Sequence, residues 1–404
     1  MTSPPEPSTY FRKGFGLKSA VRDELAADYD GRIVELLKAS DYDLTVGEVT
    51  IRLAREFGFC YGVERAVEYA YQTRRKFPDR RIYLVGEIIH NPQVNHRLRE
   101  MGIEILLRPE PTGSFDFAGI TTDDVVIMPA FGVTIDDFAA LRAIGCVLVD
   151  TTCGSVLNVW KRVEAYARDG FTALIHGKYY HEETRATASQ VRKHDGHYIV
   201  VRNMAEARLV SDFIEGRGSA ASLMETFARA VSPGFDPDEH LQRIGVANQT
   251  TMLALESMAI ADEIGASIAR ARGADARVAG FRSFDTICSA TQERQDAVRQ
   301  LLADGVDLMV VVGGFNSSNT LSLAALCVEH VPTYHIETSE AIDVDAGTIH
   351  YRPASTKHSE VDHSAWLPPG PVRVGITAGA STPNNRIGDV VARILATRGL
   401  RAPV

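Results

Sequence analysis

Short apolar runs alternate along the chain with longer stretches in which apolar residues recur every three or four positions. The runs at 81–85, 124–128, 171–175, 308–312 and 372–376 each end in a polar turn. Apolar runs of this length indicate buried strands, and the stretches between them have the spacing of helices. Because this alternation is typical of mostly parallel sheets, the pattern predicts an α/β fold.

Three of the polar turns hold a cysteine immediately before a helical stretch. Cys153 follows the apolar run 145–149, and Cys60 and Cys288 occupy turns of the same kind. The start of a helix carries free N–H groups and a positive dipole end, which favour the thiolate form of cysteine. Since thiolates bind metal, we expect three diverged α/β units to place one ligand each at a common centre. Such a ligand set lacks one member.

The repeated turns also suggest how the chain is divided. A polar leader with a short surface helix around 34–37 precedes the first strand, and Gly- and Pro-containing stretches flank an inserted helical segment. We expect five parts: a leader at 1–48, lobe 1 at 49–152, lobe 2 at 153–286 with an insertion at about 212–240, lobe 3 at 287–371, and a strand and helix at 372–404 that close the site.

Composition limits the possible partners. The chain has 404 residues, a formal net charge of −9 and five cysteines. That charge gives no reason to expect nucleic-acid binding or a basic membrane surface, and no apolar run is long enough to cross a bilayer. An odd number of scattered cysteines favours a reducing compartment over a disulfide framework, so a cytoplasmic protein is expected.

Other strand-to-helix turns are rich in serine, threonine and asparagine. Such turns present N–H and hydroxyl groups to an anion, with the dipole of the next helix behind them. Walker A and dinucleotide-binding glycine motifs are missing at the strand ends, which argues against nucleotide binding by those routes. The residues expected to hold phosphate without lysine are Ser317, Ser318, Asn319 and Ser381, with further contacts from His90 and His181.

The donor set indicates which metal group suits the cysteines. Structural zinc is commonly held by four ligands in C-x-x-C pairs, and this chain has no such pair. Three thiolates from three units instead suit one 4Fe–4S cluster whose fourth iron is open. An open iron can bind a substrate oxygen as a Lewis acid while the cluster supplies single electrons. Cys146 and Cys327 lie inside or beside apolar segments and are expected to be buried.

Taken together and in order from about residue 49 to the C-terminus, these motifs resemble the LytB family of 4-hydroxy-3-methylbut-2-enyl diphosphate reductases. The resemblance implies three α/β lobes in a pseudo-threefold arrangement around a central iron–sulfur cluster. It also implies the last step of the non-mevalonate isoprenoid pathway, a two-electron reductive removal of an allylic hydroxyl that gives isopentenyl and dimethylallyl diphosphates. The matching motifs are Gly58-Phe59-Cys60, Ile89-His90-Asn91, Asp150-Thr151-Thr152-Cys153, His181-Glu182-Glu183, Gln249-Thr250-Thr251, Asp285-Thr286-Ile287-Cys288, Asn316-Ser317-Ser318-Asn319 and Thr377-Ala378-Gly379-Ala380-Ser381.

The resemblance assigns roles residue by residue. Glu183, rather than Glu182, matches the family's proton-delivering glutamate, since it lies two residues after His181. A nearby diphosphate would disfavour the ionised form of this glutamate and so help it to carry a proton. Thr250 matches the threonine near the substrate hydroxyl, and Thr291 resembles a further pocket residue. The residues that match the cluster ligands are Cys60, Cys153 and Cys288, and those that match the diphosphate positions are His90, His181, Ser317, Ser318, Asn319 and Ser381.

The chain departs from many bacterial members of the family at Phe131, where they have a histidine that contacts phosphate. Lys178 or a backbone amide is a candidate replacement for that contact. Phe131, the long leader with residues 12–16, and the segment 176–179 resemble the cyanobacterial and plant branch. That branch draws electrons from ferredoxin, so ferredoxin, or flavodoxin, is the expected donor in a bacterial cytoplasm.

Two alternatives remain open from the sequence. Quinolinate synthase also has three lobes and three cysteines around a 4Fe–4S cluster, but it does not explain the Ser-Ser-Asn turn or the His-x-Glu pair. A non-enzymatic iron–sulfur sensor would need no glutamate–threonine relay. Adding the hydroxylated allylic diphosphate to reduced protein would change the spectrum of a reductase and leave that of a sensor unchanged.

Overall fold

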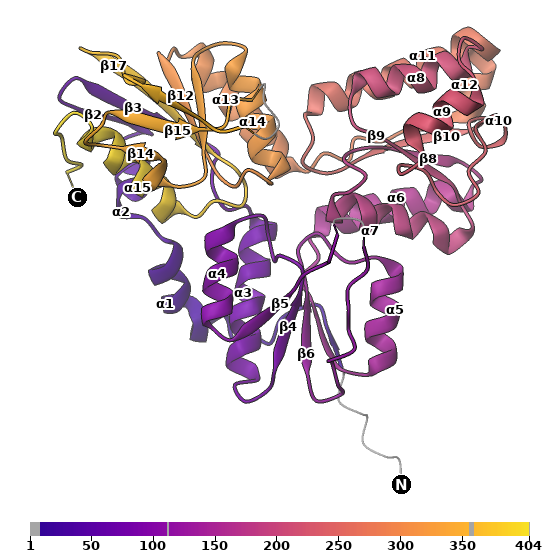
Figure 1. Ribbon diagram of the computed structural model, residues 1–404, viewed down its shortest axis with the longest axis horizontal. Coiled ribbons are helices and arrows are strands. Elements are labelled where there is room, and N and C mark those ends of the chain that lie inside the picture. Colours follow the sequence, from indigo (N-terminus) through magenta and orange to yellow (C-terminus); the bar gives the residue numbers. More distant parts are fainter. Residues whose placement is uncertain (1–8, 111–112, 355–358, 404) are drawn as a thin grey trace. The chain divides into compact units, whose positions relative to one another are not determined.

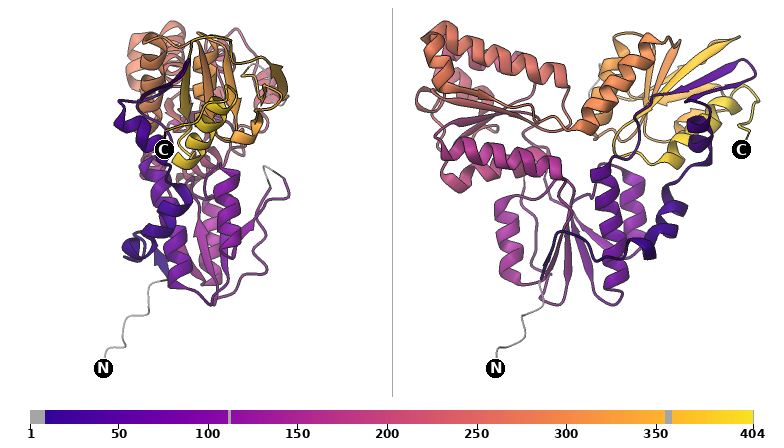
Figure 2. Two further views of the ribbon diagram at one scale, coloured as in Figure 1. Left: turned by 90° about the vertical axis from the view of Figure 1, so that its left-hand side faces the viewer. Right: turned by 180° about the vertical axis from the view of Figure 1, so that it is seen from behind.

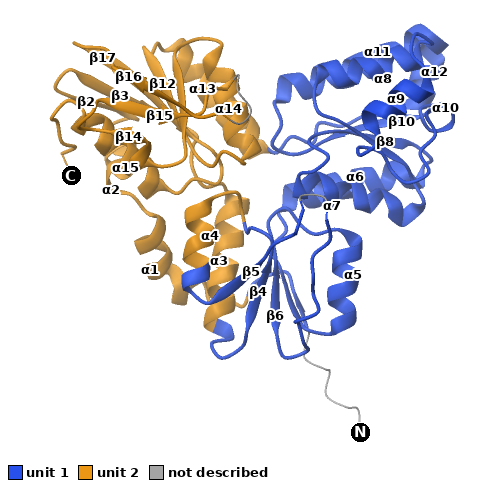
Figure 3. Ribbon diagram, in the orientation of Figure 1, with its two compact units in different colours: residues 1–14, 76–88, 99–288 blue, residues 15–75, 89–98, 289–404 orange. Residues whose placement is uncertain are grey.

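The computed structural model describes residues 9–110, 113–354 and 359–403, and the chain divides into two compact units (Figure 3). Each unit is assembled from stretches that are far apart in the sequence. Unit 1 comprises residues 1–14, 76–88 and 99–288, and unit 2 comprises residues 15–75, 89–98 and 289–404.

The described residues of unit 1 form two sheets whose neighbouring strands are all parallel. The strand orders are β1-β7-β6-β4-β5 and β11-β10-β8-β9. The strands of the first sheet are β1 (Tyr10–Phe11), β4 (Ile82–Val85), β5 (Ile103–Leu106), β6 (Val125–Met128) and β7 (Val147–Asp150), and those of the second are β8 (Thr172–His176), β9 (Tyr198–Val201), β10 (Ile244–Asn248) and β11 (Phe281–Ser283).

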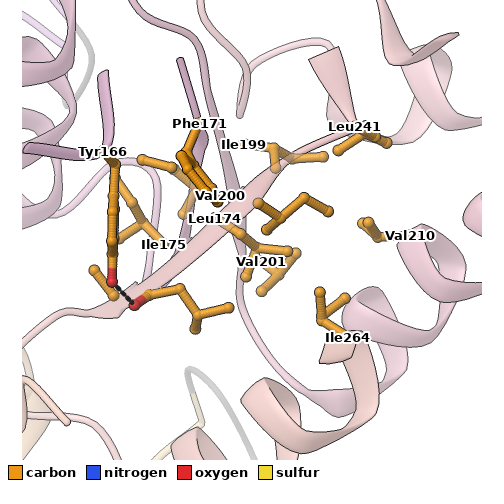
Figure 4. Packing of buried hydrophobic residues seen from close by; sticks show 14 of the residues in the cluster. Tyr166, Phe171, Leu174, Ile175, Ile199, Val200, Val201, Val210, Leu241 and Ile264 are labelled. Carbon is orange, nitrogen blue, oxygen red and sulfur yellow. Dashed lines mark hydrogen bonds between the residues drawn. The ribbon is translucent and has the colours of Figure 1, made fainter. Parts of the chain in front are cut away.

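Helices cover both faces of the second sheet, with α8 and α11 on one face and α6 on the other (Figures 1 and 2). Apolar side chains of these helices meet the sheet in a buried core, where the Tyr166 hydroxyl donates to the Val246 carbonyl at 2.9 Å (Figure 4). A Cβ at Gly245 would lie 2.6 Å from the Tyr166 ring, so glycine is needed for this packing. The helices are α5 (Ile135–Ile144), α6 (Gly154–Arg168), α7 (Glu182–Val191), α8 (Met204–Ile214), α9 (Ala220–Phe227), α10 (Pro237–His240), α11 (Ala254–Arg272) and α12 (Ala274–Gly280), with a 3-10 turn at Arg192–His194.

Unit 2 has a sheet of order β13-β12-β17-β3-β2, parallel except for the edge strand β2, and a small antiparallel sheet β14-β15-β16. Alternate residues of β12 point to opposite faces. Met309 and Val311 pack in a core with α13 and α14, and Leu308, Val310 and Val312 in a core with α2 and α15. The strands are β2 (Asp43–Val46), β3 (Val49–Leu53), β12 (Leu308–Val312), β13 (Thr333–Ile336), β14 (Ile342–Asp343), β15 (Thr348–Tyr351), β16 (Val361–Ser364) and β17 (Val372–Ala378).

The helices of unit 2 include the short helix expected around 34–37. This helix, α2, is a surface helix with one buried face: Glu35 and Lys38 are exposed, whereas Val34 and Leu37 are fully buried in the core under the sheet. The partners of the buried pair, in α15, lie near the other end of the chain. The helices are α1 (Lys18–Tyr29), α2 (Arg32–Ala39), α3 (Tyr61–Lys76), α4 (Pro92–Glu100), α13 (Ser289–Ala303), α14 (Ser318–Val328) and α15 (Asn384–Ala396), with a 3-10 turn at Ser339–Ala341.

The prediction of an α/β fold with mostly parallel sheets is confirmed, but strand pairing crosses the expected parts. The strand β3, expected to open lobe 1, pairs with β17 and belongs to the sheet of unit 2. The expected insertion at about 212–240 contains α9 and α10, and Leu223 and Phe227 of α9 are buried in the core of unit 1. The lobe boundaries themselves stay predictions.

Candidate functional site

Cys153 lies at the start of α6 in unit 1. It is the N-cap residue of that helix, with φ −62° and ψ 140°, and it is partly exposed. Its N–H group donates to the Ala130 carbonyl at 2.9 Å, and the Thr151 hydroxyl donates to the Met128 carbonyl at 2.6 Å. The end of β6 therefore fixes the turn and places the thiol at the positive end of a helix, where the thiolate is favoured.

Asp150 joins the leader to the Cys153 turn. One of its oxygens accepts from the N–H and the hydroxyl of Thr152, at 2.9 and 2.5 Å. The other accepts from the Tyr10 hydroxyl at 2.6 Å and pairs with Arg12 at 3.3 Å. Burial and the hydrogen bond to Asp150 raise the pKa of Tyr10, so its hydroxyl stays protonated and donates. The leader strand β1 is thus part of the support of this cysteine turn.

Cys288 stands beside the end of β10, also in unit 1. Its N–H group donates to the Thr250 carbonyl at 3.2 Å, and α13 begins at the next residue. The preceding turn is held by the Thr286 hydroxyl, which accepts from the Asn248 N–H at 2.7 Å. Cys288 is partly exposed, like Cys153. The predicted context of a strand end followed by a helix is therefore present at both residues.

Cys60 occupies the corresponding place in unit 2. Its N–H group donates to the Ala380 carbonyl at 3.3 Å, and its own carbonyl accepts from Glu64 in the first turn of α3 at 2.9 Å. Gly58 adopts φ +66° and donates to the carbonyl of Ala378, the last residue of β17, at 3.3 Å. A side chain at this left-handed position would be strained, so glycine lets the loop turn toward the helix.

Arg294 of α13 holds the same loop from the other side, and sequence reasoning missed it. It is 3% exposed. Its Nη2 donates to the carbonyls of Gly58 and Phe57 at 2.7 and 3.4 Å, and its Nη1 donates to the Ala290 carbonyl at 2.8 Å. Among the described residues, no carboxylate pairs with this guanidinium, and its Nε has no hydrogen-bond partner.

Cys146 and Cys327 differ from the three cysteines in turns. Both are buried, and burial raises the pKa of Cys146 to about 11 and that of Cys327 to about 12. A thiol with a raised pKa is a poor metal ligand because it resists conversion to thiolate. The prediction that these two are buried apolar residues is confirmed.

Glu183, His181 and Thr250 meet in unit 1. Glu183 is 1% exposed, and its Oε1 accepts from the Thr250 N–H at 2.6 Å. His181 is the N-cap residue of α7, and its Nδ1 accepts from the Glu183 N–H at 3.2 Å. Because Nδ1 acts as an acceptor, a neutral His181 carries its proton on Nε2, which leaves that nitrogen as a donor.

Gln249 links the elements around this carboxylate. Its Oε1 accepts from the Lys178 N–H and the Thr184 hydroxyl, both at 3.1 Å, and its Nε2 donates to the Thr251 hydroxyl at 3.0 Å. It thereby joins the loop after β8, the first turn of α7 and the loop after β10. The sequence motif contains Gln249 but gave no reason to assign it this role.

Phe131 packs its ring edge against His181, with ring centroids 5.5 Å apart and planes at 81°. An aromatic ring in this geometry restricts the imidazole without offering a hydrogen bond. The Phe131 ring therefore serves to orient His181.

The predicted diphosphate residues of unit 2 gather around the start of α14. Ser317 is the N-cap residue, and its hydroxyl accepts from the Thr320 N–H. The buried Asn319 donates from Nδ2 to the Thr291 hydroxyl at 3.3 Å and accepts at Oδ1 from the Ala380 N–H at 2.9 Å. Asn319 therefore fixes the two neighbouring turns relative to α14.

Ser381 and His90 lie beside these residues. The Ser381 hydroxyl donates to the His90 carbonyl at 3.1 Å, and the Asn91 side chain donates to the Ser381 carbonyl at 2.8 Å. His90, Thr291, Ser317, Ser318, Asn319 and Ser381 thus belong to unit 2, whereas His181, Glu183 and Thr250 belong to unit 1.

Support for the turn at 313–317 comes from residues that the sequence did not single out. The buried ring of His335 bonds through Nε2 to the Gly313 carbonyl at 2.9 Å. The Glu337 carboxylate accepts from the Phe315 N–H at 2.6 Å, and Arg352 stacks over the Phe315 ring at 3.8 Å. Their spacing from the turn in sequence has no pattern, so only the fold reveals them.

A family model described as LytB protein matches residues 51–395. The chain belongs to the LytB family. The leader lies outside the matched range of the LytB model. Similar proteins from cyanobacteria nevertheless align over nearly the whole chain, so most of the leader is shared with them.

Curated relatives in the LytB family carry one name, 4-hydroxy-3-methylbut-2-enyl diphosphate reductase. That of Thermosynechococcus vestitus is 46% identical over 392 residues, which covers 97% of this chain and 95% of the relative. Those of Gloeobacter violaceus and Acaryochloris marina are 46% and 43% identical, cover 97% and 98% of this chain, and are covered to 93% and 95%. The prediction of a reductase of this family, from its cyanobacterial side, is confirmed. Neither a quinolinate synthase nor a sensor is supported.

Solved structures agree with membership of the LytB family. A structure described as (E)-4-hydroxy-3-methyl-but-2-enyl diphosphate reductase, the terminal enzyme of the non-mevalonate pathway, is 29% identical, with a TM-score of 0.52 over 85% of this chain and 98% of that one. A structure of the reductase from Plasmodium falciparum is 20% identical, with a TM-score of 0.63 over 87% of this chain and 88% of that one, and it supports the fold. Within the described chain, no helix combines the length and apolar character needed to cross a membrane.

Proposed function

We propose that this protein catalyses the reductive dehydroxylation of 4-hydroxy-3-methylbut-2-enyl diphosphate to isopentenyl and dimethylallyl diphosphates. Membership of the LytB family and the common name of its relatives support the reaction. The observation that carries it in the structure is the buried Glu183 carboxylate held by the Thr250 N–H. A buried acid that is fixed by a backbone donor suits proton delivery to a departing hydroxyl.

The three cysteines in turns would hold one 4Fe–4S cluster, with its fourth iron free of protein ligands. The donor set fits: Cys60, Cys153 and Cys288 are partly exposed at strand-to-helix turns, while the two remaining cysteines are buried. When bound, this cluster supplies electrons singly and a Lewis-acid position for the substrate oxygen.

The reaction requires two electrons and two protons for each substrate, and it releases water as the allylic C–O bond breaks. In the proposed mechanism, Glu183 in its protonated form gives one proton to the leaving hydroxyl oxygen. The Thr250 N–H donates to Glu183 Oε1 and so fixes which oxygen faces the substrate. Burial of the carboxyl excludes bulk water from the proton that Glu183 delivers.

Binding of the diphosphate is assigned to neutral donors. In unit 2 the start of α14 offers N–H groups and the hydroxyls of Ser317 and Ser318, and a helix N-terminus favours an anion. The nearby turns contribute Ser381 and His90, with Asn319 and Thr291 holding them in place. In unit 1, His181 contributes its Nε2 N–H, the tautomer that the N-cap hydrogen bond at Nδ1 selects.

Ferredoxin, or flavodoxin, is proposed as the electron donor, supported by the similarity to cyanobacterial relatives. A cytoplasmic location is proposed with it. None of the five cysteines takes part in a disulfide, which suits a reducing compartment.

The proposal is tested with anaerobically reconstituted protein. Iron and sulfide analysis should give one 4Fe–4S cluster, and a dithionite-reduced mediator should drive conversion of the substrate to both products. Cys153→Ala should lose the cluster, while Cys146→Ala, which also removes a thiol from unit 1, should keep it. Protein that holds the cluster but leaves the substrate unchanged would refute the proposed reaction.

A further inference from the structure

The buried guanidinium of Arg294 lacks the anionic partner that a buried cation needs. Its side chain bonds to three backbone carbonyls, and within the described chain no carboxylate pairs with it. By contrast, Arg352, another largely buried arginine of unit 2, pairs with Glu360 at 2.9 Å. A buried charge without a counter-charge is strongly unfavourable, so an anion is expected close to Arg294.

The carbonyls that Arg294 binds identify that anion. Gly58, whose carbonyl lies 2.7 Å from Nη2, precedes Cys60 by two residues. The hydrogen bond to Gly58, the two intervening peptide units and the cysteine side chain together limit the distance from the guanidinium to the Cys60 sulfur to about 15 Å. At an effective dielectric constant of about 20, two unit charges about 15 Å apart shift an equilibrium by roughly sixfold. A thiolate at Cys60 is therefore within reach of the charge of Arg294.

We infer that Arg294 is a positioning residue that fixes the Cys60 loop through the Gly58 carbonyl and supplies the positive charge that offsets the thiolate there. The inference rests on the proposed function only in treating Cys60 as a metal-binding thiolate.

Arginine and lysine carry the same charge, but arginine has the hydrogen-bonding shape that this place requires. Its planar fork bonds to the carbonyls of Gly58 and Ala290 at once, whereas an ammonium group at the end of a shorter stem would lose part of this geometry. Arg294→Lys therefore keeps the positive charge but changes the hydrogen bonding, whereas Arg294→Gln removes the charge.

The charge is measured in the apoprotein with two alkylating reagents. Iodoacetate is an anion and iodoacetamide is neutral, but both attack the same thiolate, so the ratio of their rates at Cys60 reports the local potential and cancels changes in exposure. Site-resolved mass spectrometry should show that ratio falling roughly three- to tenfold in Arg294→Gln. It should stay close to the wild-type value in Arg294→Lys.

Arg393→Gln is the matched control, because Arg393 also donates to a backbone carbonyl of unit 2, that of Ile342 at 3.1 Å. It should leave the ratio at Cys60 unchanged. An unchanged ratio in Arg294→Gln, or an equal fall in Arg294→Lys, would overturn the inference. If Arg294→Gln does not fold, the lysine variant decides: a retained ratio supports the role of charge, and a lost one overturns it.

A second measurement uses the loaded protein. A redox titration should show the cluster of Arg294→Gln harder to reduce than that of the wild type by about tenfold in the reduction equilibrium, or about 59 mV for one electron. An unchanged midpoint would contradict the electrostatic role. The alkylation ratio requires neither cluster nor turnover, so failure of the proposed reaction and failure of the Arg294 inference are separable.

Discussion

The turns around Glu183 in unit 1 and those around Asn319 in unit 2 share a design but differ in chemistry. Each set begins where parallel strands end, and each rests on a buried histidine. His176 bonds to the Ser257 hydroxyl at 2.8 Å beneath the first set, and His335 bonds to the Gly313 carbonyl at 2.9 Å beneath the second. Above them, unit 1 holds a carboxylate, whereas unit 2 presents hydroxyl and amide groups.

The difference arises in the first residues of two helices. α7 begins with Glu182 and Glu183, while α14 begins with Ser318 and Asn319. Under the proposed function, the same scaffold supports proton transfer in one unit and anion binding in the other, according to which side chains follow the N-cap. Substitution of Glu183 should consequently act on kcat, and substitution of Asn319 on KM.

The largest effect is expected from Glu183→Gln. The amide retains the shape and one acceptor for the Thr250 N–H but cannot deliver a proton, so kcat should fall by about 10²–10⁴ with little change in KM. Steady-state assays with a reduced mediator measure both constants. Glu225→Gln, which removes an exposed carboxylate of unit 1, is the control and should have full activity. Full turnover by Glu183→Gln would remove this residue from the mechanism.

The two buried histidines, His176 in unit 1 and His335 in unit 2, predict how the stability of the fold depends on pH. Burial lowers the pKa of His176 and that of His335 from 6.5 to about 4. Between pH 6.5 and 4 these histidines therefore bind protons more readily in the unfolded chain than in the folded one. The free energy of unfolding is highest above pH 6.5 and decreases as the pH falls toward 4. Each residue accounts for about 3 kcal/mol of that loss. Urea unfolding between pH 7.5 and 4 should show a shallower decline for His176→Gln and for His335→Gln, and identical slopes would contradict the assignment.

Asn319→Ala should weaken substrate binding. The substitution removes the hydrogen bonds to Thr291 and to the Ala380 N–H, which hold the turns of the proposed diphosphate pocket. Loss of two such bonds corresponds to about 1–3 kcal/mol, so KM should rise roughly 5- to 100-fold while kcat changes less. A fall in kcat at constant KM would show that the two units do not divide the work in this way.

The smallest effect is expected at Phe131. Phe131→His replaces the ring that packs on His181 with one that can donate a hydrogen bond. KM should fall by about threefold below pH 6.5, where a histidine becomes charged, and less above it. A pH series of KM for this variant and for Phe131→Leu separates a gained contact from a lost packing partner.

Much of the fold was predictable because strands and helices leave local patterns. The strand ends at Cys153 and Cys288 were recognised from apolar runs of four or five residues followed by helical spacing. The assignment of β3 to unit 2 was not, since its partner β17 lies more than 300 residues later and short apolar strands look alike. Pairing between distant strands is fixed by packing in three dimensions.

The candidate site shows the same division. Residues with chemistry of their own, such as Glu183 and Ser317, were predicted from motifs. Those that act by holding other residues, such as Gln249, Arg294 and His335, were missed, because their roles depend on contacts that span 22, 71 and 236 residues of sequence without a local pattern. A buried arginine is visible in the sequence only as one charge among many.

The strand β1 also influences the order in which unit 1 is completed. Tyr10 bonds to a residue 140 positions later, so the strand has no partner until β7 has been synthesised. Closing so long a loop is slow. Until β1 pairs with it, the edge of β7 is open to strands of other molecules, which is a route to aggregation. The newly made sheet is therefore most vulnerable at the edge that later steadies the Cys153 turn.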